Sequence, residues 1–178
     1  MYRFRIDLSD VDRGVYEQLD FRVAKHPSES DLYLLTRVLA YSLNFQPGIE
    51  FSSAGLNDPD GPAIVMNEAN GGIALWIEIG NPSAKKLHKA SKASTRVKVY
   101  TYKDPQIILR EAQTNKIHRL EQIEIFSFAA DFLERLAKDL PRDVRWQVLH
   151  HDGVLTVSAG EKSEQTEIKR VRLTKNGL

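Results

Sequence analysis

A stretch of 25 residues, 79–103, contains seven basic residues and no acidic one. Four of the basic residues follow the spacing i, i+4, i+7 and i+11, which places them on one face if the segment is helical. Like charges stacked in this way repel one another, so a polyanion such as nucleic acid is one candidate for the missing counter-charges. The alternative is a solvated helix face whose counter-charges come from elsewhere in the fold. The four residues are Lys85, Lys89, Lys92 and Arg96.

Carboxylates flank the two apolar segments that precede this stretch. Asp60 lies in a turn before the apolar residues 63–66, and Glu78 stands near the end of the apolar segment 73–79. The residues 70–72, Asn-Gly-Gly, predict a tight hairpin between the two segments. The start of one strand then lies opposite the end of the other, so Asp60 and Glu78 approach each other. Two carboxylates suit a hard divalent cation such as Mg²⁺; the alternative is that Asp60 and its neighbours are ordinary turn residues.

The composition excludes several other kinds of site. The chain has no cysteine, which rules out disulfides, a disulfide-linked partner, iron–sulfur clusters, zinc fingers and thiol nucleophiles. It also lacks the glycine-rich phosphate and dinucleotide motifs, the nucleophile elbow and the His-Glu-x-x-His zinc motif. His150 and His151 are neighbours, but adjacent strand residues point to opposite faces, so we do not expect them to share a metal. Oxygen ligands remain the main metal chemistry available.

The charge totals hide an uneven distribution. The 25 basic and 24 acidic residues of this 178-residue chain give a formal net charge of +1, which by itself favours no polyanionic partner. That balance is the sum of the basic stretch and a mildly acidic remainder. A second basic group lies near the C-terminus, and its relation to the first depends on the fold. Its members are Lys169, Arg170, Arg172 and Lys175.

No segment has the roughly 20 apolar residues that a membrane-spanning helix needs, and the longest clean apolar run is 73–77. Residues 1–10 alternate apolar and charged side chains, whereas a signal peptide has an unbroken apolar stretch. The composition, 42% apolar and 28% charged, is typical of a globular protein. We therefore expect a cytoplasmic protein with no membrane partner. The sequence carries no signal for its oligomeric state.

Apolar periodicity and turn residues predict a mixed succession of strands and helices. The order indicates an α/β or α+β domain with a mixed β-sheet flanked by helices. No linker is long or polar enough to mark a boundary, so we expect a single domain over residues 1–178. The predicted strands are 1–10, 16–23, 49–52, 63–66, 73–79, 97–102, 122–126, 144–150, 154–158 and 165–173, and the predicted helices are 29–45, 84–94, one that starts at 104–105 and one around 128–136.

The most specific motif of the chain is Leu75-Trp76-Ile77-Glu78-Ile79-Gly80, followed by Pro82 and Lys89-Ala90. With further motifs spread along the whole chain, the sequence resembles the bacterial YaeQ family. The further motifs are Asp10-Val11-Asp12-Arg13, Ala24-Lys25-His26-Pro27-Ser28-Glu29, Gly55-Leu56, Asp60-Gly61-Pro62 and Tyr100-Thr101-Tyr102.

The resemblance implies a variant of the PD-(D/E)XK nuclease fold, with its core over about residues 29–102. Active sites of that superfamily take an Asp from the start of the second core strand and an acid from the third. A Glu from the first helix often joins them. In this chain Asp60 matches the Asp, Glu78 matches the acid and Glu29 stands where the helix acid would be. The resemblance thus implies that Asp60, Glu78 and Glu29 are ligands of Mg²⁺.

The superfamily has a lysine two residues after the acid, and this chain has Gly80 there. Some members take the lysine from the following helix, where Lys89 is the candidate and Lys92 lies one turn further. The implied function is a Mg²⁺-dependent nucleic-acid phosphodiesterase, a hydrolase with Asp60, Glu78 and Lys89 as catalytic residues. The four basic residues of the predicted helix face would steer the phosphate backbone. The alternative is a catalytically inactive nuclease-fold protein that binds nucleic acid or a protein partner in a regulatory role.

Overall fold

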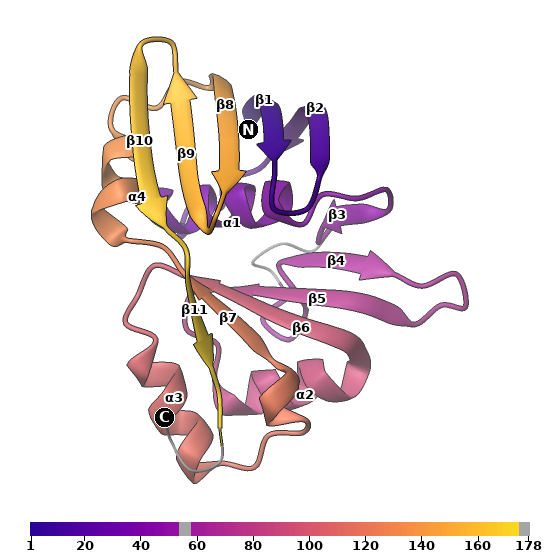
Figure 1. The fold of residues 1–178 in the computed structure, drawn as a ribbon. Coiled ribbons are helices and arrows are strands. Elements are labelled where there is room, and N and C mark those ends of the chain that lie inside the picture. The colour runs from indigo at the N-terminus through magenta and orange to yellow at the C-terminus, as the bar shows by residue number, and fades with distance from the viewer. Residues whose placement is uncertain (54–57, 175–178) are drawn as a thin grey trace. The chain divides into compact units, whose positions relative to one another are not determined.

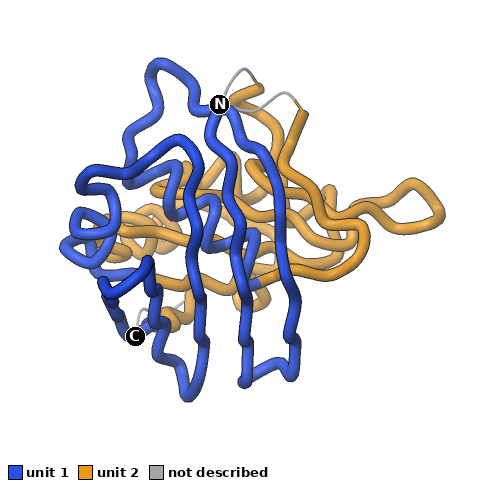
Figure 2. Tube along the Cα trace, turned by 90° about the horizontal axis from the view of Figure 1, so that it is seen from above, with its two compact units in different colours: residues 1–43, 128–169 blue, residues 44–127, 170–178 orange. Residues whose placement is uncertain are grey.

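The computed structural model describes residues 1–53 and 58–174, so the motif Gly55-Leu56 and the basic Lys175 lie outside the described residues. The described chain has the predicted mixed α+β architecture, with two mixed sheets and four α-helices (Figure 1). It divides into two compact units that alternate along the chain (Figure 2). The single domain expected from the lack of a linker remains a prediction. Unit 1 comprises residues 1–43 and 128–169, and unit 2 comprises residues 44–127 and 170–178.

Unit 1 contains the elements β1 (Tyr2–Asp10), β2 (Val15–Val23), α1 (Asp31–Leu43), α4 (Ala130–Ala137), β8 (Asp143–His151), β9 (Val154–Ala159) and β10 (Lys162–Glu167). Its five-stranded sheet has the order β10-β9-β8-β1-β2, and α1 and α4 lie on one face of that sheet (Figure 1). β1 alternates as predicted, with Phe4, Ile6 and Leu8 buried in the core. β1 pairs with β8 in parallel, with Ile6 opposite Trp146.

Unit 2 contains, in its described part, β3 (Ile49–Phe51), β4 (Ile64–Asn67), β5 (Ile73–Ile79), α2 (Ala84–Ala93), β6 (Ser94–Thr101), α3 (Gln106–Thr114), the short 3₁₀ helix η2 (Leu120–Gln122), β7 (Glu124–Ser127) and, from Arg170 on, β11 (Lys169–Arg172). Its sheet has the order β11-β7-β6-β5-β4-β3. β4 and β5 form the predicted hairpin, with Ile64 opposite Ile77, and β5, β6 and β7 run parallel. An apolar core that includes Trp76, Leu87 and Val99 packs the sheet against α2 and α3.

The predicted C-terminal strand 165–173 is two strands that belong to different sheets. β10 ends at Glu167 and β11 begins at Lys169. Ile168 stands between them and donates its backbone N–H to the carbonyl oxygen of Gly153 at 2.8 Å, outside either strand. The sequence prediction missed this break because the whole segment has the alternation of a strand.

Two local structural features fix the path of the chain from β5 into α2. Gly80 follows β5 with φ of 86°, a left-handed conformation that favours glycine. Ser83 is the N-cap of α2, and its Oγ accepts the backbone N–H of Lys86 at 3.2 Å. No helix in residues 1–53 and 58–174 is long and apolar enough to cross a membrane.

Candidate functional site

Glu78 is a buried carboxylate near the end of β5, with 3% of its surface exposed. It lies on the same face of the strand as Trp76, which packs against α2. Its Oε1 accepts the indole N–H of Trp76 at 2.7 Å, and its Oε2 lies 3.1 Å from Nζ of Lys86. Burial raises the pKa of Glu78, and Lys86 and Trp76 oppose that rise. A buried carboxyl with a shifted pKa and a specific cationic partner is a candidate functional group.

The lysine beside Glu78 is Lys86 and not the predicted Lys89. Lys86 lies in the first turn of α2, which Ser83 starts directly after β5. Lys89 lies one turn further, is exposed, and makes no ion pair with any residue in the described part of the chain. The prediction of Lys89 rested on the resemblance, which implies only that the lysine comes from the following helix and does not specify from which turn of it. The signal that could have found Lys86 is its position in the first turn after a capped helix start.

Asp60 lies in the turn that leads into β4, at the end of the hairpin that was expected. Ala63 donates its backbone N–H to the carbonyl oxygen of Ile77 at 3.0 Å, so the chain before Ala63 runs towards the end of β5 that holds Glu78. The Asp60 side chain is exposed, and its backbone N–H donates to Oδ1 of Asp58 at 3.0 Å. The structure therefore places Asp60 at the predicted end of the hairpin, without an ion pair to a described residue.

Glu29, the predicted third ligand, belongs to unit 1 and is already paired. The helix that was expected to start at residue 29 starts at Asp31, so Glu29 precedes it. Its carboxylate is buried, lies 2.9 Å from Nη2 of Arg37 and accepts the backbone N–H of His26 at 3.0 Å. Burial raises the pKa of Glu29, and Arg37 opposes that rise. This environment gives Glu29 a structural partner in its own unit.

The donor set of unit 2 fits a hard cation only in part. Each carboxylate oxygen of Glu78 has a second lone pair beyond its present partner, and Asp60 is exposed. Mg²⁺ is commonly held by one or two protein carboxylates together with water molecules. Within the described ranges, however, no group of three or more Asp, Glu or His side chains is arranged to hold a metal ion. Of the three predicted ligands, Asp60 and Glu78 belong to unit 2 and Glu29 belongs to unit 1.

The basic face of α2, defined as Lys85, Lys89 and Lys92, is a second feature of unit 2. All three residues are exposed, whereas Leu87 and Ala90 on the opposite side are buried. The prediction that these lysines share one helix face is therefore confirmed. None of the three makes an ion pair with a residue that the structure describes.

Arg96, the fourth predicted member of that face, does not lie on the helix, and this part of the prediction is wrong. α2 ends at Ala93, and Ser94 caps it by donating its backbone N–H to the carbonyl oxygen of Ala90. The residues that follow are rich in β-branched side chains, which favour a strand over a further helical turn. Arg96 lies in β6 and pairs with Glu124 of β7 at 3.2 Å.

Residues 116–119 add positive charge beside the basic face. His118 donates its backbone N–H to Nδ1 of His88 on α2 at 3.0 Å, and the two rings meet edge-on. Desolvation lowers the pKa of His118, and so do the nearby charges, which are those of Arg119, Lys92, His88 and Lys116. Sequence analysis missed this segment because only the fold brings it to α2.

Comparison with known proteins finds relatives over almost the whole chain. The family model described as YaeQ protein matches residues 1–168. A crystal structure of a YaeQ protein from Pseudomonas syringae superposes with a TM-score of 0.86 at 29% identity, covering 98% of this chain and 96% of that one. The YaeQ protein from Xanthomonas axonopodis pv. citri gives a TM-score of 0.88 at 26% identity, with 97% and 98% covered. The "Uncharacterized protein YaeQ" of Escherichia coli K12 is 26% identical over 160 residues, which are 89% of this chain and 87% of that protein.

Proposed function

Because this chain belongs to the YaeQ family, and the names of its relatives state no activity, we propose a function from the surface of unit 2: the protein binds nucleic acid through the basic face of α2. The observation that supports this proposal is the row of exposed lysines without acidic partners in the described chain. Like charges at this spacing destabilise a helix slightly unless a ligand neutralises them.

The dimensions of the basic face suit a phosphate backbone. A helix rises 1.5 Å per residue, so Lys85 and Lys92 are about 10 Å apart along the axis. One strand of B-DNA presents about three phosphates over that length. The positive charge around His118 extends the same surface. The cytoplasmic location predicted from the sequence suits such a partner and remains a prediction.

The triple variant Lys85→Gln, Lys89→Gln, Lys92→Gln is expected to bind DNA and RNA oligonucleotides about tenfold more weakly, or worse, at low salt. The plot of log affinity against log salt should flatten by about 0.9 for each duplex phosphate that the variant no longer neutralises. Fluorescence anisotropy over a range of salt concentrations measures both quantities.

A matched control removes the same number of charges from unit 1, through Lys138→Gln, Arg145→Gln and Lys162→Gln. All three of these residues are exposed. If the control variant loses as much affinity as the α2 variant, binding depends on net charge alone and the proposed surface is wrong. Wild-type protein that binds no oligonucleotide at low salt would reject nucleic acid as the partner.

The Glu78–Lys86 pair favours a second candidate, a Mg²⁺-dependent phosphodiesterase of the PD-(D/E)XK kind. In this candidate Asp60 and Glu78 would hold the ion, and the chemistry it would supply is the polarisation of a phosphate and the activation of water. Lys86 orients the Glu78 carboxylate and supplies positive charge beside the position where negative charge develops. Lys89, on the basic face, helps to hold the substrate backbone.

Calorimetric titration with Mg²⁺ or Mn²⁺ tests this second candidate without an activity assay. We expect wild-type protein to bind the ion, Glu78→Gln to abolish binding and Asp60→Asn to weaken it, with Glu161→Gln as an exposed control in unit 1. Because burial raises the pKa of Glu78 above its ordinary value of 4.5, protons compete with the ion, and affinity should rise as the pH rises through the pKa of the folded protein. Absence of binding to wild type would reject the candidate, as would cleavage that persists in both site variants.

A further inference from the structure

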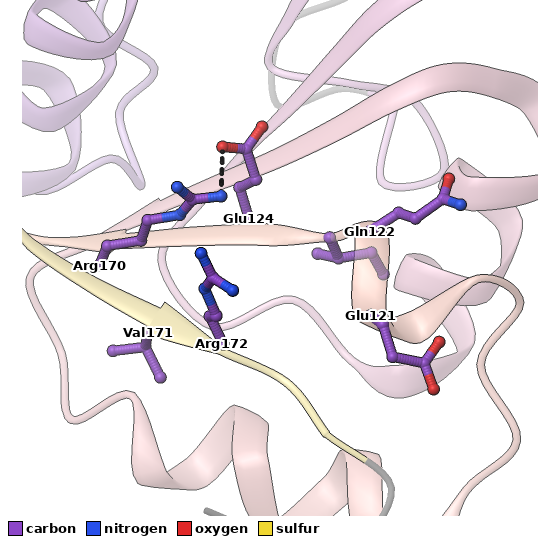
Figure 3. Close-up of a pocket in the computed structure, with 7 residues that line it drawn as sticks. Glu121, Gln122, Glu124, Arg170, Val171 and Arg172 are labelled. Atoms are coloured by element: carbon purple, nitrogen blue, oxygen red, sulfur yellow. Dashed lines mark ion pairs between the residues drawn. The ribbon is translucent and has the colours of Figure 1, made fainter.

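A pocket of about 290 Å³ lies in unit 2 between the edge strand β11 and the segment that runs from η2 into β7 (Figure 3). We propose that this pocket binds a phosphate group through the guanidinium groups of Arg170 and Arg172. The proposal does not depend on the basic face of α2, because none of the described residues that line the pocket belongs to α2.

β11 directs both arginines away from α2. Val171 stands between them and packs against the core that α2 and α3 cover. Since successive strand residues point to opposite faces, Arg170 and Arg172 share the face of β11 that points away from this core. Arg96 lies on that side too, because its neighbour Val97 belongs to the same core. The fold therefore brings Arg96 of the first basic stretch of the sequence together with the second stretch.

Two arginines, Arg170 and Arg172, and two glutamates, Glu121 and Glu124, line the pocket. The carboxylate of Glu124 makes two ion pairs. Its Oε1 lies 3.2 Å from Nη2 of Arg96, and its Oε2 lies 3.1 Å from Nη2 of Arg170. Arg172 makes no ion pair within residues 1–53 and 58–174. Its guanidinium lies close to that of Arg170, while the carboxylate of Glu121 points away from both (Figure 3). Arg172 is therefore the guanidinium group of this pocket that has no carboxylate partner in the described chain.

The chemistry of these groups selects a tetrahedral oxyanion. A guanidinium group presents planar paired donors that match two oxygens of a phosphate at once, and it remains charged at any physiological pH. The volume is close to the lower end for small-molecule sites, so the pocket has room for a phosphate and part of the group attached to it. None of the described residues that line the pocket is aromatic, so recognition rests on the phosphate and not on a stacked base.

Titration with inorganic phosphate, followed by calorimetry and by the NMR signal of the Arg172 side-chain N–H, tests the site. We expect Arg172→Gln to bind phosphate about tenfold more weakly, which is the loss typical of one charge-assisted contact. Arg110→Gln removes an exposed arginine from α3 of the same unit and should leave affinity unchanged. Glu124→Gln should bind more tightly, because it removes the competing carboxylate.

Three results would overturn the proposal: no binding to wild type at tens of millimolar phosphate, equal losses in Arg172→Gln and Arg110→Gln, or an Arg172 signal that phosphate does not shift. The triple lysine variant of α2 must retain phosphate binding at this pocket, so failure of the proposed nucleic-acid surface leaves this test intact. Adenosine monophosphate and a short single-stranded oligonucleotide then identify the source of the phosphate. If adenosine monophosphate displaces bound phosphate at least as well as phosphate itself, the ligand is a small molecule. If only the oligonucleotide displaces it, the ligand is a phosphate of a nucleic-acid backbone.

Discussion

Replacing Asp10 with alanine is expected to lower the free energy of unfolding by about 3–5 kcal/mol at pH 7. Asp10 ends β1 and has 0% of its surface exposed. Its Oδ2 lies 2.6 Å from Nε of Arg13, and its Oδ1 lies 2.9 Å from Nδ1 of His150. His150 Nε2 in turn lies 3.3 Å from Oδ2 of Asp12. Alanine removes the one carboxylate that the Arg13 guanidinium and the His150 imidazole share, and it opens a cavity at the end of the sheet.

Urea denaturation at pH 7 measures this effect, and the same hairpin offers a control. Asp20 pairs with Arg3 at 2.7 Å, but the pair is exposed to solvent. Asp20→Ala should change the urea midpoint only slightly, because exposed ion pairs contribute little. Asp10→Asn keeps the shape of the side chain and one hydrogen-bond acceptor, so its urea midpoint should fall between those of Asp10→Ala and Asp20→Ala. Equal midpoints for Asp10→Ala and Asp20→Ala would show that the buried cluster is not a major source of stability.

Replacing Arg37 with methionine is expected to cost about 3–5 kcal/mol at pH 7 and less in mildly acidic solution. Methionine keeps most of the volume of the side chain but leaves the buried Glu29 carboxylate without its cation. It also removes the donor that bonds the carbonyl oxygen of Ala24 at 2.7 Å. In the variant the pKa of Glu29 should rise further, since burial raises it and Arg37 is the first factor that opposes the rise.

The sign of the pH dependence follows from that pKa. A carboxyl with a raised pKa binds its proton more tightly in the folded protein than in the unfolded chain. Its favourable contribution to the free energy of unfolding is therefore complete below the ordinary pKa of 4.5. That contribution is lost as the pH rises through the pKa of the folded protein. Urea denaturation at pH 5 and pH 8 should therefore show a larger loss at pH 8. The double variant Glu29→Gln, Arg37→Met leaves no buried charge at these two positions and should recover most of the stability. A loss that is equal at both pH values would contradict the assignment of Glu29 as a charge held by Arg37.

Local patterns in the sequence predict most of the elements because they depend on neighbouring residues. The turn at Asp152-Gly153 is an example, since both residues have positive φ, 50° and 73°, as a two-residue hairpin turn requires. β9 then pairs with β8 directly, with His151 opposite Val154. The break between β10 and β11 was missed because residues 165–173 alternate as a single strand does, and the bond from Ile168 to Gly153 joins residues that are not neighbours in the sequence.

The candidate site could be predicted only in part, for a related reason. Glu78 is recognisable because a charge in an otherwise apolar strand needs an explanation. Its partner Lys86 is not, because the pairing depends on the turn of α2 at which the helix starts. Arg37 is likewise hidden, since in the helical pattern it looks like an ordinary polar position, and only the fold shows that it neutralises Glu29.

The parallel pairing of β1 with β8 governs the order in which the chain can fold during its synthesis. The partners of β1 in this pairing run from Asp143 to His150. At 5–20 residues per second, a ribosome reaches them on the order of 10 s after it has made β1. Until then one edge of β1 has no strand beside it, and the apolar side chains of Phe4, Ile6 and Leu8 lack part of their core. Newly made chains therefore expose apolar surface for a period during synthesis. A chaperone that binds apolar segments would find its largest binding surface in that period.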